Sequence, residues 1–398
     1  MEPIRSARRV FGVSAAACAI AAIPAVASAA ADTGHAGSAG SGVPPAAAVP
    51  KGFRATAMSW TSASHGWVLG TEQCGAKYGN CRGSQVIGTT NGGQTWHLVG
   101  KLTASIPKLG QGGTGITEIR FGTDKAGWAF GPGLYRTADG GRTWKPVRVP
   151  GGGKQVLDLA VTPTSVYVVA SPCGFDAGIC KGRLTAWRAG LTGTSWTRMS
   201  FPRPLHVNVS ANVAGYGSTV YVIDTMIEGT RPTQFYASID RGRHFSARHN
   251  PCPASTIHQL IQAAPTSATK VALLCDGNPG FGKAVKAVYV SRNTGKKDTY
   301  AGTMSQWGIQ AQLTVSPSGN LAVATWSIGS FIDINDTKGG TTWHQVIGSG
   351  DGGAGFNDIT YVSNKVAWVV GSPASMFPAY GRLLKTTDAG RHWHFVRF

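Results

Sequence analysis

Seven copies of one short motif constrain this chain more than any other feature. The motif has a hydroxyl residue, Asp two positions later, Gly two after that and an aromatic three after the Gly, as in the segment 137–144, TADGGRTW. Its central positions are 91, 139, 191, 240, 293, 338 and 388, which are 48, 52, 49, 53, 45 and 50 residues apart. One four-stranded propeller blade has a period of this length. The spacing therefore predicts an all-β fold, a seven-bladed β-propeller with four-stranded antiparallel blades.

The residue types of the motif suit a tight turn. A short Asp or Asn side chain accepts hydrogen bonds from backbone N–H groups across the turn, and Gly adopts the positive φ that the turn needs. Five copies keep this central residue: Asn91, Asp139, Asp240, Asn293 and Asp388. Leu191 and Lys338 stand there in the third and sixth copies. We expect Gly and packing alone to hold those two turns.

A second repeat lies upstream of each motif and reads as a hairpin of two apolar strands. Examples are residues 119–131, IRFGTDKAGWAFG, and 359–371, ITYVSNKVAWVVG. Seven such hairpins accompany the seven motifs, and each pair of repeats predicts one complete blade.

With these residues in place, the chain resembles the Asp-box (BNR) repeat propellers of the WD40/YVTN/BNR-like and sialidase superfamily groups. It is most similar to the photosystem II stability/assembly-factor-like propellers. Residues 119–144 match the repeat pattern of that family almost throughout, and residues 359–393 match it nearly as well. The resemblance covers about 53 to 398. It implies the propeller fold, but members include hydrolases, receptors and assembly factors, so it assigns no activity.

The N-terminus has the pattern of an export signal. Three arginines precede an Ala-rich apolar run at 10–26, and Ala27-Ser28-Ala29 offers a cleavage site. We expect residues 1–29 to be a signal peptide of bacterial type, 30–52 a disordered Ala/Gly/Pro linker and 53–398 the propeller. Cys18 offers the alternative of a lipoprotein anchor. No second apolar run of spanning length follows, so we expect a secreted protein without a membrane span after cleavage.

Export makes the remaining six cysteines candidates for disulfides. Cys74–Cys81 and Cys173–Cys180 share one spacing, which favours two local bridges and leaves Cys252–Cys275 as the third. The alternative is a metal site. Neither short loop holds a His or further Cys to complete a ligand set, so we expect no metal.

Three carboxylates occupy an equivalent position in three blades. They are the only catalytic candidates that the sequence offers, and they are weak ones. Glu118, Asp158 and Asp358 each lie three residues before the expected end of an inner strand, and Gln312 fills the same place in blade 6. They could form a polar ring at the central channel. Alternatively, they could cap backbone groups of a neighbouring blade, which their repetition favours, since a catalytic residue is usually needed once.

Catalysis is otherwise poorly supported. Sialidases have six blades and a Phe/Tyr-Arg-Ile-Pro segment before the first motif, whereas this chain has seven copies and reads Phe53-Arg54-Ala55-Thr56. No phosphate loop, nucleophile elbow or metal-binding His pair is present. We expect no cofactor, and whether the chain is an enzyme stays open, with the balance against it.

The charge is strongly positive, +19 in the whole chain and +17 once residues 1–29 are removed. The residue after the motif Gly is basic in four copies: Arg142, Arg243, Lys296 and Arg391. Arg136, Arg241, Arg292 and Lys297 flank the same turns. Equivalent turns should bring these charges to one rim, where they either bind an anionic partner or form a solvated face.

The sequence therefore favours a secreted, monomeric binding or assembly propeller that recognises a protein, a glycan or an anionic cell-wall polymer. The alternative is an extracellular glycoside hydrolase or lyase acting at the propeller mouth. An exported chain without a recognition module is not expected to bind a specific nucleic acid.

Overall fold

The computed structural model describes residues 47–71, 83–106, 115–174, 182–206, 210–225, 233–253, 259–277, 284–304, 308, 310–326, 330–337, 340–349, 355–372 and 382–398. The chain divides into Met1–Pro45, which lies outside these residues, and Ala46–Phe398, the unit described below. The signal peptide stays a prediction. Ala47 forms an isolated antiparallel bridge with Leu98, so the chain pairs with the propeller before the predicted boundary at Phe53.

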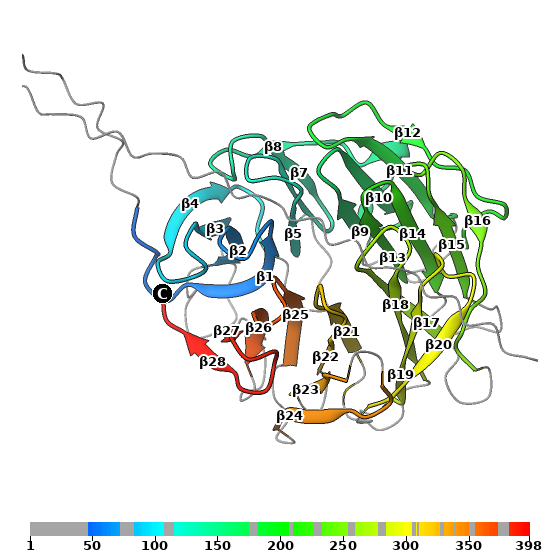
Figure 1. Ribbon diagram of the computed structural model, residues 1–398. Coiled ribbons are helices and arrows are strands. Elements are labelled where there is room, and N and C mark those ends of the chain that lie inside the picture. Colours follow the sequence, from blue (N-terminus) through cyan, green and yellow to red (C-terminus); the bar gives the residue numbers. More distant parts are fainter. Residues whose placement is uncertain are drawn as a thin grey trace, which may run out of the picture. The chain divides into compact units, whose positions relative to one another are not determined.

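Seven antiparallel sheets of four strands are arranged in a ring (Figure 1). Blades 1 to 4 consist of β1 (Arg54–Trp60), β2 (Gly66–Thr71), β3 (Ser84–Thr89), β4 (His97–Leu102); β5 (Glu118–Phe121), β6 (Gly127–Phe130), β7 (Leu134–Thr137), β8 (Lys145–Pro146); β9 (Gln155–Val161), β10 (Ser165–Ser171), β11 (Thr185–Gly190), β12 (Thr197–Arg198); and β13 (Ser210–Tyr216), β14 (Thr219–Thr225), β15 (Gln234–Ser238), β16 (Ser246–Ala247).

Blades 5 to 7 consist of β17 (Gln259–Pro265), β18 (Val271–Asp276), β19 (Lys286–Ser291), β20 (Asp298–Thr303); β21 (Gln310–Val315), β22 (Leu321–Trp326), β23 (Ser330–Asn335), β24 (His344–Ser349); and β25 (Gly355–Tyr361), β26 (Ala367–Ser372), β27 (Arg382–Thr386), β28 (His394–Val396). A short 3-10 turn, η1 (Pro150–Gly152), precedes β9. The predicted fold class is confirmed.

Every blade uses four strands that are consecutive in the sequence, paired in order from the centre outward. No strand is shared between the first and last blades, so side-chain packing closes the ring. At that seam Trp60 of β1 stacks on Trp368 of β26, with ring centroids 4.5 Å apart. Phe398 near the end of the chain packs edge-on against Phe53 and Trp96.

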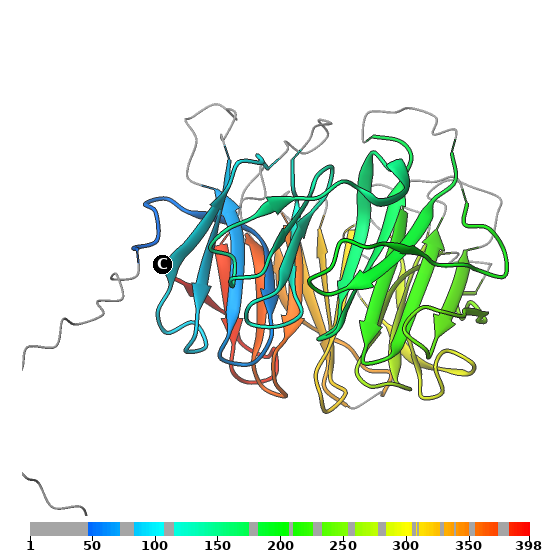
Figure 2. The same cartoon turned by 90° about the horizontal axis from the view of Figure 1, so that it is seen from above.

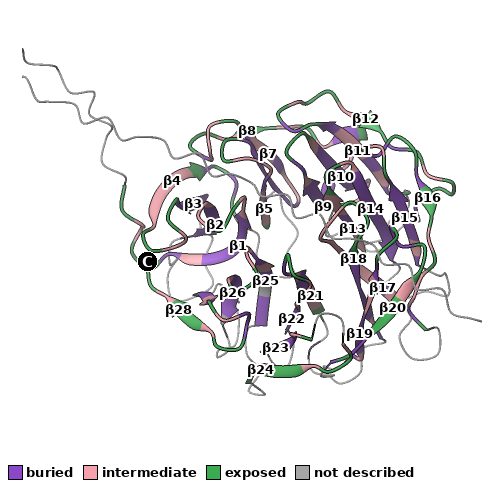
Figure 3. Cartoon of the chain, viewed as in Figure 1, coloured by how far each residue is buried: buried purple, intermediate pink, exposed green. Residues whose placement is uncertain are grey.

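The core lies between blades rather than inside any one of them. The described residues form seven apolar clusters, and each cluster takes its members from two neighbouring blades. The second strands are covered on both faces, as in the wholly buried β2 and β14, whereas β8, β12 and β16 are exposed (Figure 3). Continuous burial of the second strands explains their unbroken apolar runs.

The motif turns join the third and fourth strands and lie at the lower edge of Figure 2. In blade 2, the Asp139 carboxylate accepts from the Thr137 hydroxyl and from the Thr143 N–H, while the Gly141 N–H donates to the Thr137 hydroxyl. Asn91, Asp240, Asn293 and Asp388 accept corresponding bonds in their own turns. The central carboxylates and amides are thus used by their own turns.

The two exceptional turns differ from one another. In the third, Leu191 is buried between blades 2 and 3, and its carbonyl accepts from the Trp128 indole, so packing holds this turn as expected. In the sixth, the expectation of Gly and packing alone is wrong. Asn335 accepts from the N–H and hydroxyl of Thr337 and donates to the Gly340 carbonyl. An amide placed three residues before Lys338 therefore takes over the bonding role.

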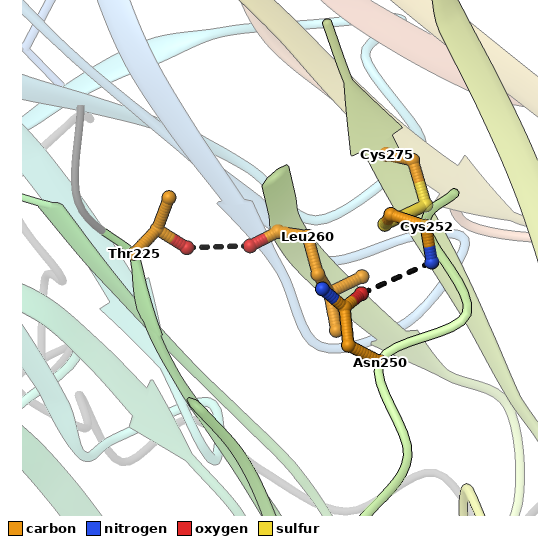
Figure 4. Close-up of a disulfide and its surroundings, with 5 residues drawn as sticks. All are labelled: Thr225, Asn250, Cys252, Leu260 and Cys275. Atoms are coloured by element: carbon orange, nitrogen blue, oxygen red, sulfur yellow. Dashed lines mark hydrogen bonds between the residues drawn. A yellow bond between two sulfur atoms is a disulfide. The ribbon is translucent and has the colours of Figure 1, made fainter. Parts of the chain in front are cut away.

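Cys252 and Cys275 form a disulfide, with their Cα atoms 5.6 Å apart (Figure 4). The bridge joins the segment after β16 to β18, within the cluster between blades 4 and 5. The Cys252 N–H donates to the Asn250 side chain, and the Thr225 hydroxyl donates to the Leu260 carbonyl nearby. The other two predicted bridges each include cysteines outside the described residues and stay predictions.

Replacing both Cys252 and Cys275 by alanine should lower the free energy of unfolding. The bridge closes a loop with a sequence separation of 23. Without the bridge the unfolded chain gains conformational entropy, which should lower the free energy of unfolding by about 3 kcal/mol. Chemical denaturation of the oxidised protein and of the double variant measures the difference. Equal midpoints and slopes would show that this bridge contributes nothing to stability.

Candidate functional site

The innermost strands place one residue of each blade at the same level of the central channel. The strand register aligns seven positions, each opposite an equivalent residue of the second strand: Ala57, Glu118, Asp158, Asn212, Gln262, Gln312 and Asp358. We call these residues the inner ring. The sequence predicted the equivalence of Glu118, Asp158, Gln312 and Asp358 but not the membership of the other three.

Inner-ring side chains bind the backbone of the next blade. Asp358 accepts from the Met58 N–H at 3.0 Å, and Asp158 accepts from the Val213 N–H at 2.8 Å. The amide oxygens of Asn212 and Gln262 accept from Ala263 and Leu313 in the same way. In each bond the donor N–H belongs to the residue that comes directly after the inner-ring residue in the sequence of the next blade. The same contact therefore repeats around the ring.

A hydroxyl also bonds across two blade junctions, between blades 1 and 2 and between blades 6 and 7. Ala57 has no acceptor, and the Ser59 hydroxyl two residues later accepts from the Phe121 N–H at 2.7 Å. The Thr314 hydroxyl accepts from the Tyr361 N–H at 2.9 Å. Asp158 and Asp358 therefore belong to a ring of blade-to-blade bonds. Their repetition at one position of the blade reflects this capping of backbone groups in the neighbouring blade.

Glu118 differs from the other two carboxylates because the side-chain hydrogen bond that it accepts comes from a cation. Arg120 contacts Glu118 at 3.0 Å and Asp358 at 3.6 Å. The same guanidinium donates to the Ile119 carbonyl and lies over the Phe130 ring. Sequence reasoning missed Arg120, although it stands two residues after Glu118 on the same strand, a spacing that places both side chains on one face.

A cavity of about 840 Å³ occupies the centre of the ring, and all seven innermost strands contribute to its wall. Glu118, Asp158 and Asp358 all line it, so the three candidates share one space. Arg120 and the amides of the inner ring complete a polar wall. Its volume is in the range of small-molecule sites, and its depth would admit a side chain or a sugar unit.

Burial in the cavity wall shifts the pKa values of the three carboxyl groups. Burial raises the pKa of Glu118 from 4.5 to about 8, with Arg120 opposing the shift and the two aspartates reinforcing it. Burial also raises the pKa values of Asp158 and Asp358. Hydrogen bonds from the Val213 and Met58 N–H groups oppose those shifts. Burial therefore favours the protonated form of all three carboxyl groups, and at Glu118 no backbone hydrogen bond from a described residue opposes it.

Glu118→Gln should reduce the pH dependence of stability. Because its folded-state pKa lies above the unfolded value, the folded protein binds the extra proton, and stability falls as pH rises from about 4.5 to about 8. The variant carries no titrating group there, so its unfolding free energy should fall less over that interval. Denaturation curves at pH 5 and pH 8 test this. An unchanged slope would contradict the pKa assignment.

The predicted rim residues lie on equivalent turns at one end of the propeller, and all four are exposed: Arg142, Arg243, Lys296 and Arg391. Their surroundings differ. Arg142 donates to the Asp139 carbonyl, and Arg391 pairs with Asp336 at 2.6 Å.

Within the described residues, no group of three or more His, Cys, Asp or Glu could hold a metal ion. No helix in that part of the chain is long and apolar enough to cross a membrane.

The fold and cavity define a seven-bladed β-propeller with a polar central channel. No protein-family model and no curated protein sequence matches the chain. Its fold is similar to that of YCF48 from Cyanidioschyzon merolae, with a TM-score of 0.52, 15% identity and coverage of 86% of this chain and 98% of that one. It is also similar to the β-propeller domain of the Trilobed protease from Pyrococcus furiosus, with a TM-score of 0.50, 10% identity and coverage of 87% and 99%.

A third solved structure, YCF48 bound to a D1 peptide, matches with a TM-score of 0.47, 17% identity and coverage of 70% of this chain and 80% of that one. At these identities the likenesses concern the fold alone. The propeller whose structure is described as having an open velcro topology is the Pyrococcus furiosus domain. In the part of the present chain that the structure describes, the first and last blades share no strand.

Proposed function

We propose that this chain is a secreted, monomeric Asp-box (BNR) propeller that binds a protein or glycan partner without cleaving it. One observation carries the proposal: Asp158 and Asp358 are both occupied as acceptors for the backbone of the next blade. A catalytic carboxylate must exchange a proton with substrate or attack it, and doing so through Oδ2 would cost each aspartate its bond to the next blade. The channel then supplies a shaped polar surface for recognition.

Blocking the channel tests where a partner binds. Gln310 is an exposed wall residue at the start of β21, and tryptophan there would narrow the cavity without removing an inner-ring bond. Peptide and oligosaccharide arrays should identify ligands of the wild-type protein that Gln310→Trp no longer binds. Thr197→Trp, on the exposed outer strand β12, is the matched control. Ligands that bind both variants equally would place recognition outside the channel.

A hydrolase is the second candidate, and Glu118 favours it. A carboxyl group with a pKa of about 8 in a polar cavity could donate a proton to a glycosidic oxygen, and Asp358 lies 3.6 Å from the same Arg120 guanidinium. Against this, Asp358 would have to leave both the Met58 N–H and the guanidinium to act as a base or nucleophile.

A further inference from the structure

Four turns of blades 4 and 5 form one connected surface at the motif end of the propeller. They are residues 217–218, 239–245, 266–270 and 292–297. The Arg241 N–H donates to the Ser218 carbonyl, the Thr219 hydroxyl donates to the Ala268 carbonyl, and the Thr294 N–H donates to the Thr269 carbonyl. These bonds link each turn to the next. We call the four turns the basic surface.

The basic surface carries six exposed cations: Arg241, Arg243, Lys270, Arg292, Lys296 and Lys297. Its only carboxylate is Asp240, which accepts from the Ser238 hydroxyl and from the N–H groups of Arg243 and His244. Slight burial would raise the pKa of Asp240, but these bonds hold it well below its usual range. None of the six cationic side chains has an ion pair or side-chain hydrogen bond with another described residue.

The remaining motif turns do not share this excess. Arg391 of blade 7 is paired with Asp336 of blade 6, and Arg142 of blade 2 donates to its own turn beside Asp139. Lys125 is next to Asp124 in the first turn of blade 2. Among the described residues of this end, the unbalanced positive charge is therefore concentrated on blades 4 and 5, which the prediction of one basic rim did not indicate.

Two large apolar side chains stand exposed at the same end of blade 4. Tyr216, 48% exposed, ends β13 directly before turn 217–218, and Ile239, 66% exposed, lies between Ser238 and Asp240. Two scattered side chains are too small an area for insertion into a bilayer or for a hydrophobic protein interface. An aromatic ring beside several cations instead suits a partner that alternates apolar ring faces with negative charges.

We propose that the basic surface binds an anionic polysaccharide, with the cations contacting its repeated carboxylates and Tyr216 packing on a sugar ring. Cations on three separate turns can engage several charges of one chain at once, so a polymer gains avidity that a single acidic sugar lacks. The inference rests on the proposed binding function and adds the class of partner and a surface apart from the channel.

Binding of fluorescent polygalacturonate to the full chain tests this. The blade 4–5 variant combines Arg243→Gln, Lys270→Gln, Lys296→Gln and Lys297→Gln. The matched control combines Lys125→Gln, Arg142→Gln, Lys365→Gln and Arg391→Gln, which removes the same charge from other turns of the same end. We expect the first variant to weaken binding about tenfold or more and the control to change it far less, with wild-type binding weakening as salt rises.

Tyr216→Ala separates sugar recognition from charge. It should weaken binding of polygalacturonate but leave the residual binding of polyglutamate unchanged, since polyglutamate has carboxylates without sugar rings. Unchanged melting temperatures confirm that all variants are folded. Equal losses in the two charge variants would overturn the assignment to blades 4 and 5. Equal wild-type affinity for polyglutamate, for duplex DNA, for uncharged dextran or for phosphatidylglycerol vesicles would overturn the assignment of the partner.

The same samples distinguish the two proposals. Release of reducing ends from bound polygalacturonate would reject the non-cleaving function, whichever surface holds the polymer. Intact polygalacturonate that does not bind rejects the basic surface as a polysaccharide site and leaves the channel hypothesis to its own test.

Discussion

Replacing Asp358 by alanine should lower the free energy of unfolding by about 3–5 kcal/mol, the range observed when one partner of a buried ion pair is removed. The residue is 6% exposed, and its carboxylate accepts from the Met58 N–H and lies 3.6 Å from Arg120. Its loss leaves an N–H without its acceptor and a guanidinium with one fewer carboxylate, at the junction where blade 7 meets blade 1. Chemical denaturation measures the change.

Asp358→Asn is the informative control. The amide keeps an oxygen that can accept from Met58 but removes the charge facing Arg120, so its effect should fall between those of the wild type and Asp358→Ala. If Asp358→Ala and the wild type had equal unfolding free energies, the inner ring would not hold the blades together. The carboxylate would then be free for another role.

Replacing Trp368 by alanine should also lower the free energy of unfolding by about 3–5 kcal/mol. The indole is fully buried, stacks on Trp60 and lies against Gly93 of the first motif turn. Gly93 has a φ of +80°, and a Cβ there would lie 2.3 Å from the Trp368 ring, which is why only glycine fits. The residue removed thus belongs to the apolar cluster that packs blade 7 against blade 1, whose described residues share no strand.

Phe395 supplies the comparison for this prediction. It lies 47% exposed on β28 in the same blade, where Arg382 covers its ring, and Phe395→Ala should change stability by no more than about 0.5 kcal/mol. Similar losses in both variants would show that destabilisation reflects general loss of aromatic surface in blade 7. Closure of the ring would then not depend on Trp368.

The repeats predicted the architecture because each motif marks the same turn of every blade. Trp67 shows the physical basis: its indole donates to the Gly140 carbonyl in the motif turn of the next blade, as Trp128 does to Leu191. The tryptophan of one repeat and the turn of the following one therefore form a single contact. A chain that repeats both at a constant interval has few other folds available.

The site was less predictable from the sequence. Counting back from strand ends found Glu118, Asp158 and Asp358, because the strands end in register. It could not show that their partners are backbone groups of the next blade, since those distances depend on how the ring closes. Arg120 was overlooked, although its spacing of two residues from Glu118 places both side chains on one face of β5. The charge pattern indicated that basic residues of four copies gather on one rim, whereas the pairing of Arg391 with Asp336 became visible only in three dimensions.

These observations assign different roles to the central channel and to the motif end of the propeller. The inner ring fixes the blades around a polar channel, and the motif end presents an excess of cations on blades 4 and 5. Neither feature requires a chemical step. Both suit a protein that holds its partner by shape and charge.

The most direct test of the central claim is to measure polymer cleavage by the wild-type protein and by Glu118→Gln. Oligosaccharides and polysaccharides, polygalacturonate among them, are incubated at pH 5 and pH 8, and newly formed reducing ends are counted alongside binding. We predict that the protein retains bound polymer intact and that Glu118→Gln binds as well as the wild type. Reducing ends that the wild type releases and Glu118→Gln does not would contradict a binding propeller and identify Glu118 as a catalytic acid.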